Sequence, residues 1–287
     1  MYTLSNDVVA KIQTFIKAKL DDERLKNKFP NPLLREDILS MLNMYCTVVY
    51  YPLPEETING FNLPGIIGVN GEEKTFVYIN TAQTIEKQVF TAAHELGHIW
   101  GIDTVVSTDV ENSFLCECGE KIINRFAAEL LMPEDLFIAT CVYELERYKE
   151  NEKNITISNI LKVITNIMTH FFVPYKAVVH RLGELKFLSE DSVALLLGES
   201  NIPLDKFLRF VNQNLKNNGY TNFVEPSEKR WIDGLADLLD TAQKQKSVTN
   251  NKIDKLREHF DLNANQDIGN TLDKKVNISI EEDDEDA

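Results

Sequence analysis

The chain has few cysteines and lacks the segments that would carry it into or across a membrane. Its four cysteines in 287 residues form neither a disulfide framework nor the paired spacing of a zinc ribbon. The N-terminus has no charged-then-apolar leader, and no apolar run reaches the length of a membrane span. We therefore expect a cytoplasmic globular protein with reduced thiols, folded as one or two domains.

Basic side chains are in the minority. There are 30 lysines and arginines against 45 acidic residues, a net charge of −15, and no local Lys/Arg cluster. Such a body repels the phosphates of nucleic acids, so direct binding to nucleic acid is not expected. Six of the acids form the run Glu281–Asp286, and we predict that residues 263–287 are a disordered, solubilising tail. A less favoured interpretation is an electrostatic lure for a basic DNA-binding partner.

Histidine is scarce, yet two of the five histidines share one motif, His94-Glu95-Leu96-Gly97-His98. Residues four apart on an α-helix are rotated by only about 40° and lie roughly 6 Å apart along the axis. Both imidazoles can therefore reach one Zn²⁺ ion. Glu95 lies about 100° further round the helix, where it is too far to share the metal easily but can take a proton from an attacking water.

The residues around this motif predict the helix that it needs. A helix is expected from Ile85, with Thr84 able to cap its start and Gly101 able to end it. Apolar residues recur at helical spacing on one side: Val89, Ala92, Leu96, Ile99 and Trp100. Two histidines satisfied within a core would lie among these residues, but His94 and His98 fall on the opposite side. The position of the two histidines on the helix, opposite its apolar side, therefore favours metal binding.

A catalytic zinc needs a third protein ligand besides the two histidines. One class of zinc proteases continues the motif through a glycine to a third histidine, but here Thr104 holds that position and Asp103 precedes it. A neutral hydroxyl is a poor ligand, so this alternative is weakened but stays open.

A carboxylate on a later helix is the other source of a third ligand, and Glu111, Glu117 and Glu120 are available. Asn124 lies one turn after Glu120, where its side chain could orient a ligand by a hydrogen bond. The segment 121–131 is strongly apolar and predicts a helix buried beside the site. Glu120 is therefore the better candidate.

Three stretches make the chain resemble the ImmA/IrrE-type metallopeptidases of bacteria and their mobile elements. They are Gln88–His98 (QVFTAAHELGH), Glu120–Pro133 (EKIINRFAAELLMP) and Phe172–Leu182 (FVPYKAVVHRL). The second is the most specific, and the resemblance covers about residues 35–190. The chain departs from the family pattern at Ile123, where alanine is usual, and at Pro174, where serine usually caps a helix.

The resemblance implies a zincin that holds one zinc ion through His94, His98 and Glu120, with Glu95 as the general base. Two histidines and a carboxylate also suit Mn²⁺ or Fe²⁺. Known members cleave transcriptional repressors of the helix-turn-helix type. We therefore expect a zinc-dependent endopeptidase that cleaves such a repressor. The alternative is a zinc-holding regulatory partner that sequesters a repressor without cleaving it.

The expected fold class is α+β: a zincin-like metallopeptidase core, with a small mixed sheet, the histidine helix and the glutamate-ligand helix, followed by a helical C-terminal region. Strands are predicted at Cys46–Tyr51, Gly65–Val69 and Phe76–Ile79. An edge strand of such a sheet can hold an extended peptide by backbone hydrogen bonds. The expected divisions are an N-terminal helical lead (1–34), the zincin domain (35–190), helices (191–262) and the acidic tail (263–287).

The remaining apolar periodicity predicts helices. The expected ranges are 7–20, Leu34–Met44, Pro133–Arg147, two helices within 156–187, Leu204–Leu215, Arg230–Ala242 and Asn251–Leu262. The pair within 156–187 superficially suggests a helix-turn-helix, but its second helix lacks a basic face, so packing is favoured over DNA binding. Four residues could stabilise an oxyanion but have no spacing argument: Tyr143, His170, Tyr175 and His180.

Overall fold

The structure, a computed structural model, describes residues 4–26, 28–54, 58–67, 73–107, 115–148 and 155–262. Contacts divide the chain into two compact units, Met1–Lys229 and Arg230–Ala287. The predicted acidic tail at 263–287 lies outside the described residues, and the predicted domain boundaries stay predictions.

The sheet of the first unit is small and mixed. Its strands are β1 (Thr47–Tyr51), β2 (Gly60–Ile67) and β3 (Glu73–Asn80). They lie in the order β2-β3-β1, with β1 parallel and β2 antiparallel to β3. The strands predicted around β1 and β3 are confirmed. The third prediction was wrong about its start, because β2 begins at Gly60 rather than Gly65; Val69 lies outside the described residues.

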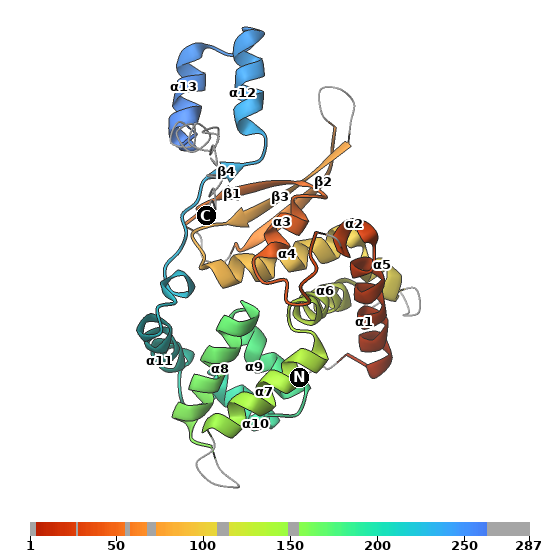
Figure 1. The fold of residues 1–287 in the computed structure, drawn as a ribbon, viewed down its shortest axis with the longest axis vertical. Helices are drawn as coiled ribbons and strands as arrows, with labels where there is room; N and C mark the ends of the chain where they lie inside the picture. Colours follow the sequence, from red (N-terminus) through yellow and green to blue (C-terminus); the bar gives the residue numbers. More distant parts are fainter. Residues whose placement is uncertain are drawn as a thin grey trace, which may run out of the picture. The chain divides into compact units, whose positions relative to one another are not determined.

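Two helices carry the residues of the predicted site. Helix α4 (Ile85–Trp100) contains the histidine motif, and helix α6 (Leu115–Leu131) contains Glu120. In Figure 1, α4 lies between the sheet and α6, and it contacts both. Gly101 adopts a left-handed conformation (φ 71°) and ends α4 as predicted. Thr84 precedes α4 but caps no backbone N–H; its hydroxyl donates to Glu86 Oε1 over 2.6 Å instead.

Gly97 lets α4 and α6 approach each other closely. It lies between the two histidines, and a Cβ atom added there would come within 2.8 Å of Phe126 Cδ1 and 3.3 Å of Ile123 Cγ2. Both neighbours are buried side chains of α6, and the Phe126 ring is packed edge-on against Phe15 and Trp100. The missing side chain of Gly97 therefore sets the spacing of the helices that bear the site.

The other helices of the first unit surround this centre. They are α1 (Asn6–Leu20), α2 (Glu23–Lys26), α3 (Asp37–Leu42), α5 (Ile102–Ser107), α7 (Glu134–Tyr148), α8 (Ile157–Phe171), α9 (Tyr175–Glu184), α10 (Glu190–Leu196), α11 (Leu204–Asn217) and the 3-10 helix η1 (Thr221–Phe223). Helices α1 and α5 pack on α6, while α7, α9 and α11 pack on α8. The apolar periodicity predicted most of these helices, and α2, α5, α10 and η1 were not predicted.

A buried ion-pair network joins α6 to α9. Arg181 is fully buried, and its guanidinium lies 2.8 Å from Glu129 and 3.5 Å from Glu184. Arg125 pairs with the same two carboxylates, at 3.1 Å from Glu129 and in a short contact with Glu184. Because unpaired charges are costly in an interior, this network fixes α6 against α9.

Residues 227–229 fold back over the start of α4. Glu228 N–H donates to the Thr81 carbonyl, the Thr81 hydroxyl donates to the Lys229 carbonyl, and Gln88 donates to Ser227 Oγ. Nearby in α4, Glu86 is buried, and its Oε2 has no hydrogen-bond partner in the described part of the chain. Burial raises the pKa of Glu86 to about 7.

The second unit contains a short strand and two helices. They are β4 (Trp231–Ile232), α12 (Leu235–Lys244) and α13 (Asn250–His259), and the two helices contact each other. The prediction of one helix over Arg230–Ala242 was wrong in its first part. Gly234 adopts a left-handed conformation (φ 70°) directly before α12, so the preceding residues cannot continue that helix.

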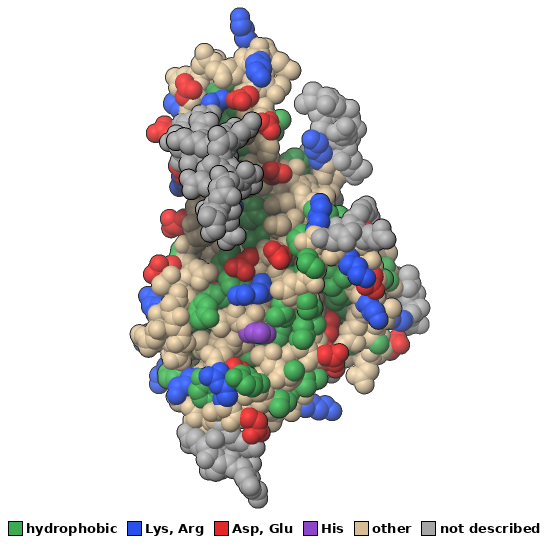
Figure 2. Space-filling view, in the orientation of Figure 1, with side chains coloured by type: hydrophobic (Ala, Val, Ile, Leu, Met, Phe, Trp, Pro, Cys, Tyr) green, Lys and Arg blue, Asp and Glu red, His purple; other side chains and the backbone are tan. Residues whose placement is uncertain are grey.

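The predicted fold class is confirmed, because a small mixed sheet packs on the histidine helix and helices dominate the rest of the described chain. None of the described helices combines the length and apolar character of a transmembrane segment. Acidic and basic side chains are interspersed on the face shown in Figure 2.

Candidate metal centre

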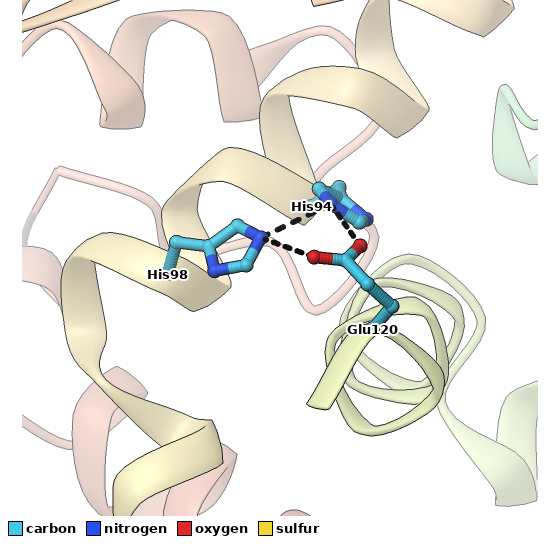
Figure 3. A group of neighbouring side chains, drawn as sticks. All are labelled: His94, His98 and Glu120. Carbon is cyan, nitrogen blue, oxygen red and sulfur yellow. Dashed lines mark hydrogen bonds and ion pairs between the residues drawn. The ribbon is translucent and has the colours of Figure 1, made fainter. Parts of the chain in front are cut away.

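The structure brings His94, His98 and Glu120 together. The two histidines project from adjacent turns of α4, and Glu120 reaches them from α6 (Figure 3). The Nε2 atoms of the two rings lie 3.2 Å apart. Glu120 Oε2 lies 3.4 Å from His94 Nε2, and Glu120 Oε1 lies 3.6 Å from His98 Nε2. Ligand atoms of all three residues therefore face the same small space.

These distances fit a single tetrahedral metal ion. When metal–ligand bonds are about 2.1 Å long, two ligand atoms of a tetrahedron lie about 3.4 Å apart. The distances here run from 3.2 to 3.6 Å, with a different Glu120 oxygen facing each histidine. All three residues are partly exposed, and all three ligand atoms lie within 4.8 Å of one another. The cluster could therefore hold one divalent ion and leave further positions open to solvent.

Asn124 orients the first histidine. Its Oδ1 atom lies 3.0 Å from His94 Nδ1, one helical turn beyond Glu120 on α6. Because the amide oxygen is an acceptor, this bond requires that His94 carry its proton on Nδ1. In the neutral imidazole the lone pair of Nε2 is then directed at the cluster, where Glu120 Oε2 lies 3.4 Å away. Both atoms could donate electron pairs to a cation placed between them.

The Glu95 side chain contacts the sheet. It is buried, and its Oε2 accepts a hydrogen bond of 3.0 Å from the side-chain amide of Asn62 on β2. Asn62 pairs with Val77 of β3, so the sheet fixes its position. Sequence reasoning missed Asn62. The available signal was a lone amide between the apolar residues Phe61 and Leu63.

Cys46 lies near the site but is not a reactive thiol. Burial, and then the negative charge of Glu95, raises the pKa of Cys46 to about 12. Its Sγ donates to the Leu42 carbonyl over 3.4 Å. The thiol therefore stays protonated at neutral pH, as expected for a structural cysteine.

Two of the other candidate ligands, Asp103 and Thr104, lie outside the cluster. Asp103 and Thr104 are in α5, where Asp103 Oδ1 accepts from the Thr104 N–H at 2.9 Å, and neither belongs to the cluster. Glu111 lies outside the described residues. Glu117 is in α6, but its side chain is not among those described. The ligand roles of His94, His98 and Glu120 stay a prediction that this geometry supports.

The four residues considered for oxyanion stabilisation are dispersed. The buried Tyr175 hydroxyl is engaged with the Leu196 carbonyl at 3.1 Å. Tyr143 and His170 line a hollow formed largely by α7 and α8, away from the cluster. His180 lines a different hollow that also includes Asn124.

Comparison with known proteins gives one family. The sequence profile of the Peptidase_M78 family, described as an IrrE N-terminal-like domain, matches residues 46–183. No curated protein matches the chain significantly. The matched range contains all three strands of the first unit, α4 with its histidines, α6 with Glu120, and nearly all of α9. Residues 46–183 are therefore similar to the IrrE N-terminal-like domain of this peptidase family.

Proposed function

We propose that the protein is a zinc-dependent endopeptidase whose substrate is a transcriptional repressor of the helix-turn-helix type. The convergence of His94, His98 and Glu120 carries this proposal, because these donor types at these distances suit zinc. The family match supports a metallopeptidase-type activity. The repressor as substrate rests on the resemblance to ImmA/IrrE-type enzymes.

Four side chains of this chain prepare the metal position. His94, His98 and Glu120 would hold the ion, and Asn124 keeps His94 in the tautomer that offers Nε2. When bound, Zn²⁺ polarises the scissile carbonyl and lowers the pKa of the attacking water. The cluster is half-exposed, so a polypeptide can approach it from solvent.

Glu95 is assigned the proton transfers. Its carboxylate accepts a proton from the attacking water while the new C–O bond forms at the scissile carbonyl. It then delivers that proton to the amine nitrogen as the C–N bond breaks, so the charges balance. The Asn62 amide engages Oε2, which leaves Oε1 as the atom we assign to proton transfer.

Strand β2 is the element that we assign to substrate binding. It forms one edge of the sheet and contacts α4. An extended segment of substrate can add to this edge by backbone hydrogen bonds. Asn62 lies on the same strand, so a bound segment would lie close to the residue that holds Glu95.

The direct test uses a helix-turn-helix repressor encoded beside the gene for this protein. Incubation with zinc-loaded protein is expected to yield two repressor fragments, and a chelator is expected to prevent cleavage. Glu95→Gln is expected to keep its zinc but to produce no fragments. Stoichiometric binding without fragments would favour sequestration and contradict the proposal, as would cleavage by the Glu95→Gln variant.

A further inference from the structure

A hollow of about 870 Å³ adjoins the candidate metal centre. Its lining includes Phe90 of α4 and Asn124 of α6. Phe90 lies one turn before His94 on α4, and Asn124 is hydrogen-bonded to His94 itself. The hollow therefore begins one side chain from the cluster, and it extends from there to α9.

The charged lining of this hollow is mainly basic. Four cationic side chains face two carboxylates there: Lys121, Arg125, Lys176 and Lys186 against Glu134 and Glu184. This excess is notable in a chain whose net charge is −15. The local charge is therefore opposite in sign to that of the whole molecule.

Both carboxylates of the lining already have partners. Glu184 pairs with Arg125 and with the fully buried Arg181. Glu134 accepts a hydrogen bond of 2.9 Å from the side-chain amide of Gln13. Arg125 is equally committed, since it also pairs with Glu129.

Two lysines of the lining carry positive charges that are not paired with a described carboxylate. Lys176 is the second residue of α9 and Lys186 follows its end, and both are exposed. Within the described ranges neither ammonium group is part of an ion pair. An ammonium group is a compact charge on a flexible stem, so each lysine can reach toward an anionic group in the hollow without any rearrangement of the backbone.

We propose that this hollow binds a carboxylate of the polypeptide substrate, close to the scissile bond. The inference rests on the proposed peptidase function and adds a specificity to it. Lys176 and Lys186 are the specificity-determining residues, because they supply positive charge that no carboxylate pairs with in the described part of the chain. Arg125 and Lys121 add to the local potential, while Asn124 marks the side nearest the reacting bond.

A peptide library tests this directly on the full-length zinc-loaded protein. The probe is a mixture of synthetic dodecapeptides with randomised central positions, in which the new ends are identified by mass spectrometry. Asp or Glu is expected to be enriched at one position within about three residues of the cut. A terminal carboxylate offers the same chemistry, so the library is run with free and with amidated C-termini. Cleavage confined to the free form would assign the hollow to the chain end.

Substitutions in the lining then test whether the hollow causes the preference for Asp or Glu near the cut. Substituting both lysines, Lys176→Gln with Lys186→Gln, is expected to lower kcat/KM for the best Glu-containing peptide about fivefold and to spare its Gln counterpart. Lys176→Glu is expected to favour Lys at that position. The control is Lys206→Gln, an equally exposed lysine on α11 that lines none of the hollow.

The outcomes separate the two proposals. Cleavage by the wild type without acidic enrichment, or enrichment that survives the double substitution, would overturn the carboxylate site alone. Failure to cleave any peptide or repressor would overturn the peptidase function. It would also overturn the carboxylate site, which depends on that function. Because both lysines are exposed, the substitutions are expected to leave the melting temperature unchanged.

Discussion

Replacing Gly97 by alanine probes how the spacing of two helices controls the metal centre. The added Cβ would lie 2.8 Å from Phe126 Cδ1, whereas carbon atoms pack best at about 3.5–4.0 Å. Phe126 is fully buried between Phe15 and Trp100, so its ring has little room to move. Helix α6 must therefore shift away from α4 by about 0.7 Å or more.

The shift has two measurable consequences. Overpacking costs about 1–3 kcal/mol, and the better helix propensity of alanine recovers about 1 kcal/mol, so Gly97→Ala is expected to lower the free energy of unfolding by roughly 1 kcal/mol. Glu120 moves with α6, away from histidines that it now approaches to 3.4 and 3.6 Å. We expect zinc affinity to fall about tenfold.

Gly119 provides the matched control, because it precedes Glu120 within α6 and a Cβ added there meets no described atom within 4 Å. Gly119→Ala is expected to stabilise the protein by about 0.5–1 kcal/mol and to leave zinc affinity unchanged. The assays are chemical unfolding of the metal-free protein and competition for zinc with a chromogenic chelator. If Gly97→Ala behaved like Gly119→Ala in both, the reasoning from helix spacing would be refuted.

Three further predictions concern other parts of the first unit. Burial raises the pKa of Glu86 from 4.5 to about 7, so the folded protein favours the neutral carboxyl group. The folded state is therefore most stable, with respect to this group, below pH 4.5. As the pH rises toward 7, the free energy of unfolding is expected to fall by about 3 kcal/mol. Glu86→Gln is therefore expected to raise the free energy of unfolding at pH 8 but not at pH 4, and equal effects at both pH values would contradict the assignment. Arg181→Met is expected to lower the free energy of unfolding by about 3 kcal/mol, because the buried Glu129 loses one of its ion-pair partners. Adding Glu129→Gln to this variant is expected to restore more than half of that loss. If the losses of the two substitutions simply added in urea unfolding, the pairing would be refuted. Asn62→Ala is expected to lower kcat about tenfold with little change in KM or zinc content, because it frees the Glu95 carboxylate to turn; an unchanged kcat would remove Asn62 from the site.

The parts of the site that follow from local sequence could be predicted. The spacing of His94 and His98 needs only a helix, and apolar periodicity with Gly101 predicts that helix. Glu120 and Asn124 are one turn apart on a second helix, so their shared face is also a local property. The strands before α4 follow from β-branched and aromatic runs.

The parts that depend on pairing distant segments could not be predicted. Asn62 reaches Glu95 only because β2 pairs with β3 in one particular register, and no local pattern specifies that register. Arg181 and Glu129 lie in stretches that resemble the family, yet periodicity does not reveal that they pair. Trp231 was predicted within a helix because its spacing to Leu235 and Leu238 is helical. The helix begins only at Leu235, however, because Gly234 separates it from Trp231.

The most direct test of the central claim is the metal content of the purified protein and its variants, measured by mass spectrometry together with zinc affinity. We predict one zinc ion per chain in the wild type and in Glu95→Gln, and a loss of affinity of at least about tenfold in His94→Ala, His98→Ala and Glu120→Ala alike. A Glu120→Ala variant that bound zinc as tightly as the wild type would contradict the proposal that a carboxylate from α6 completes the site.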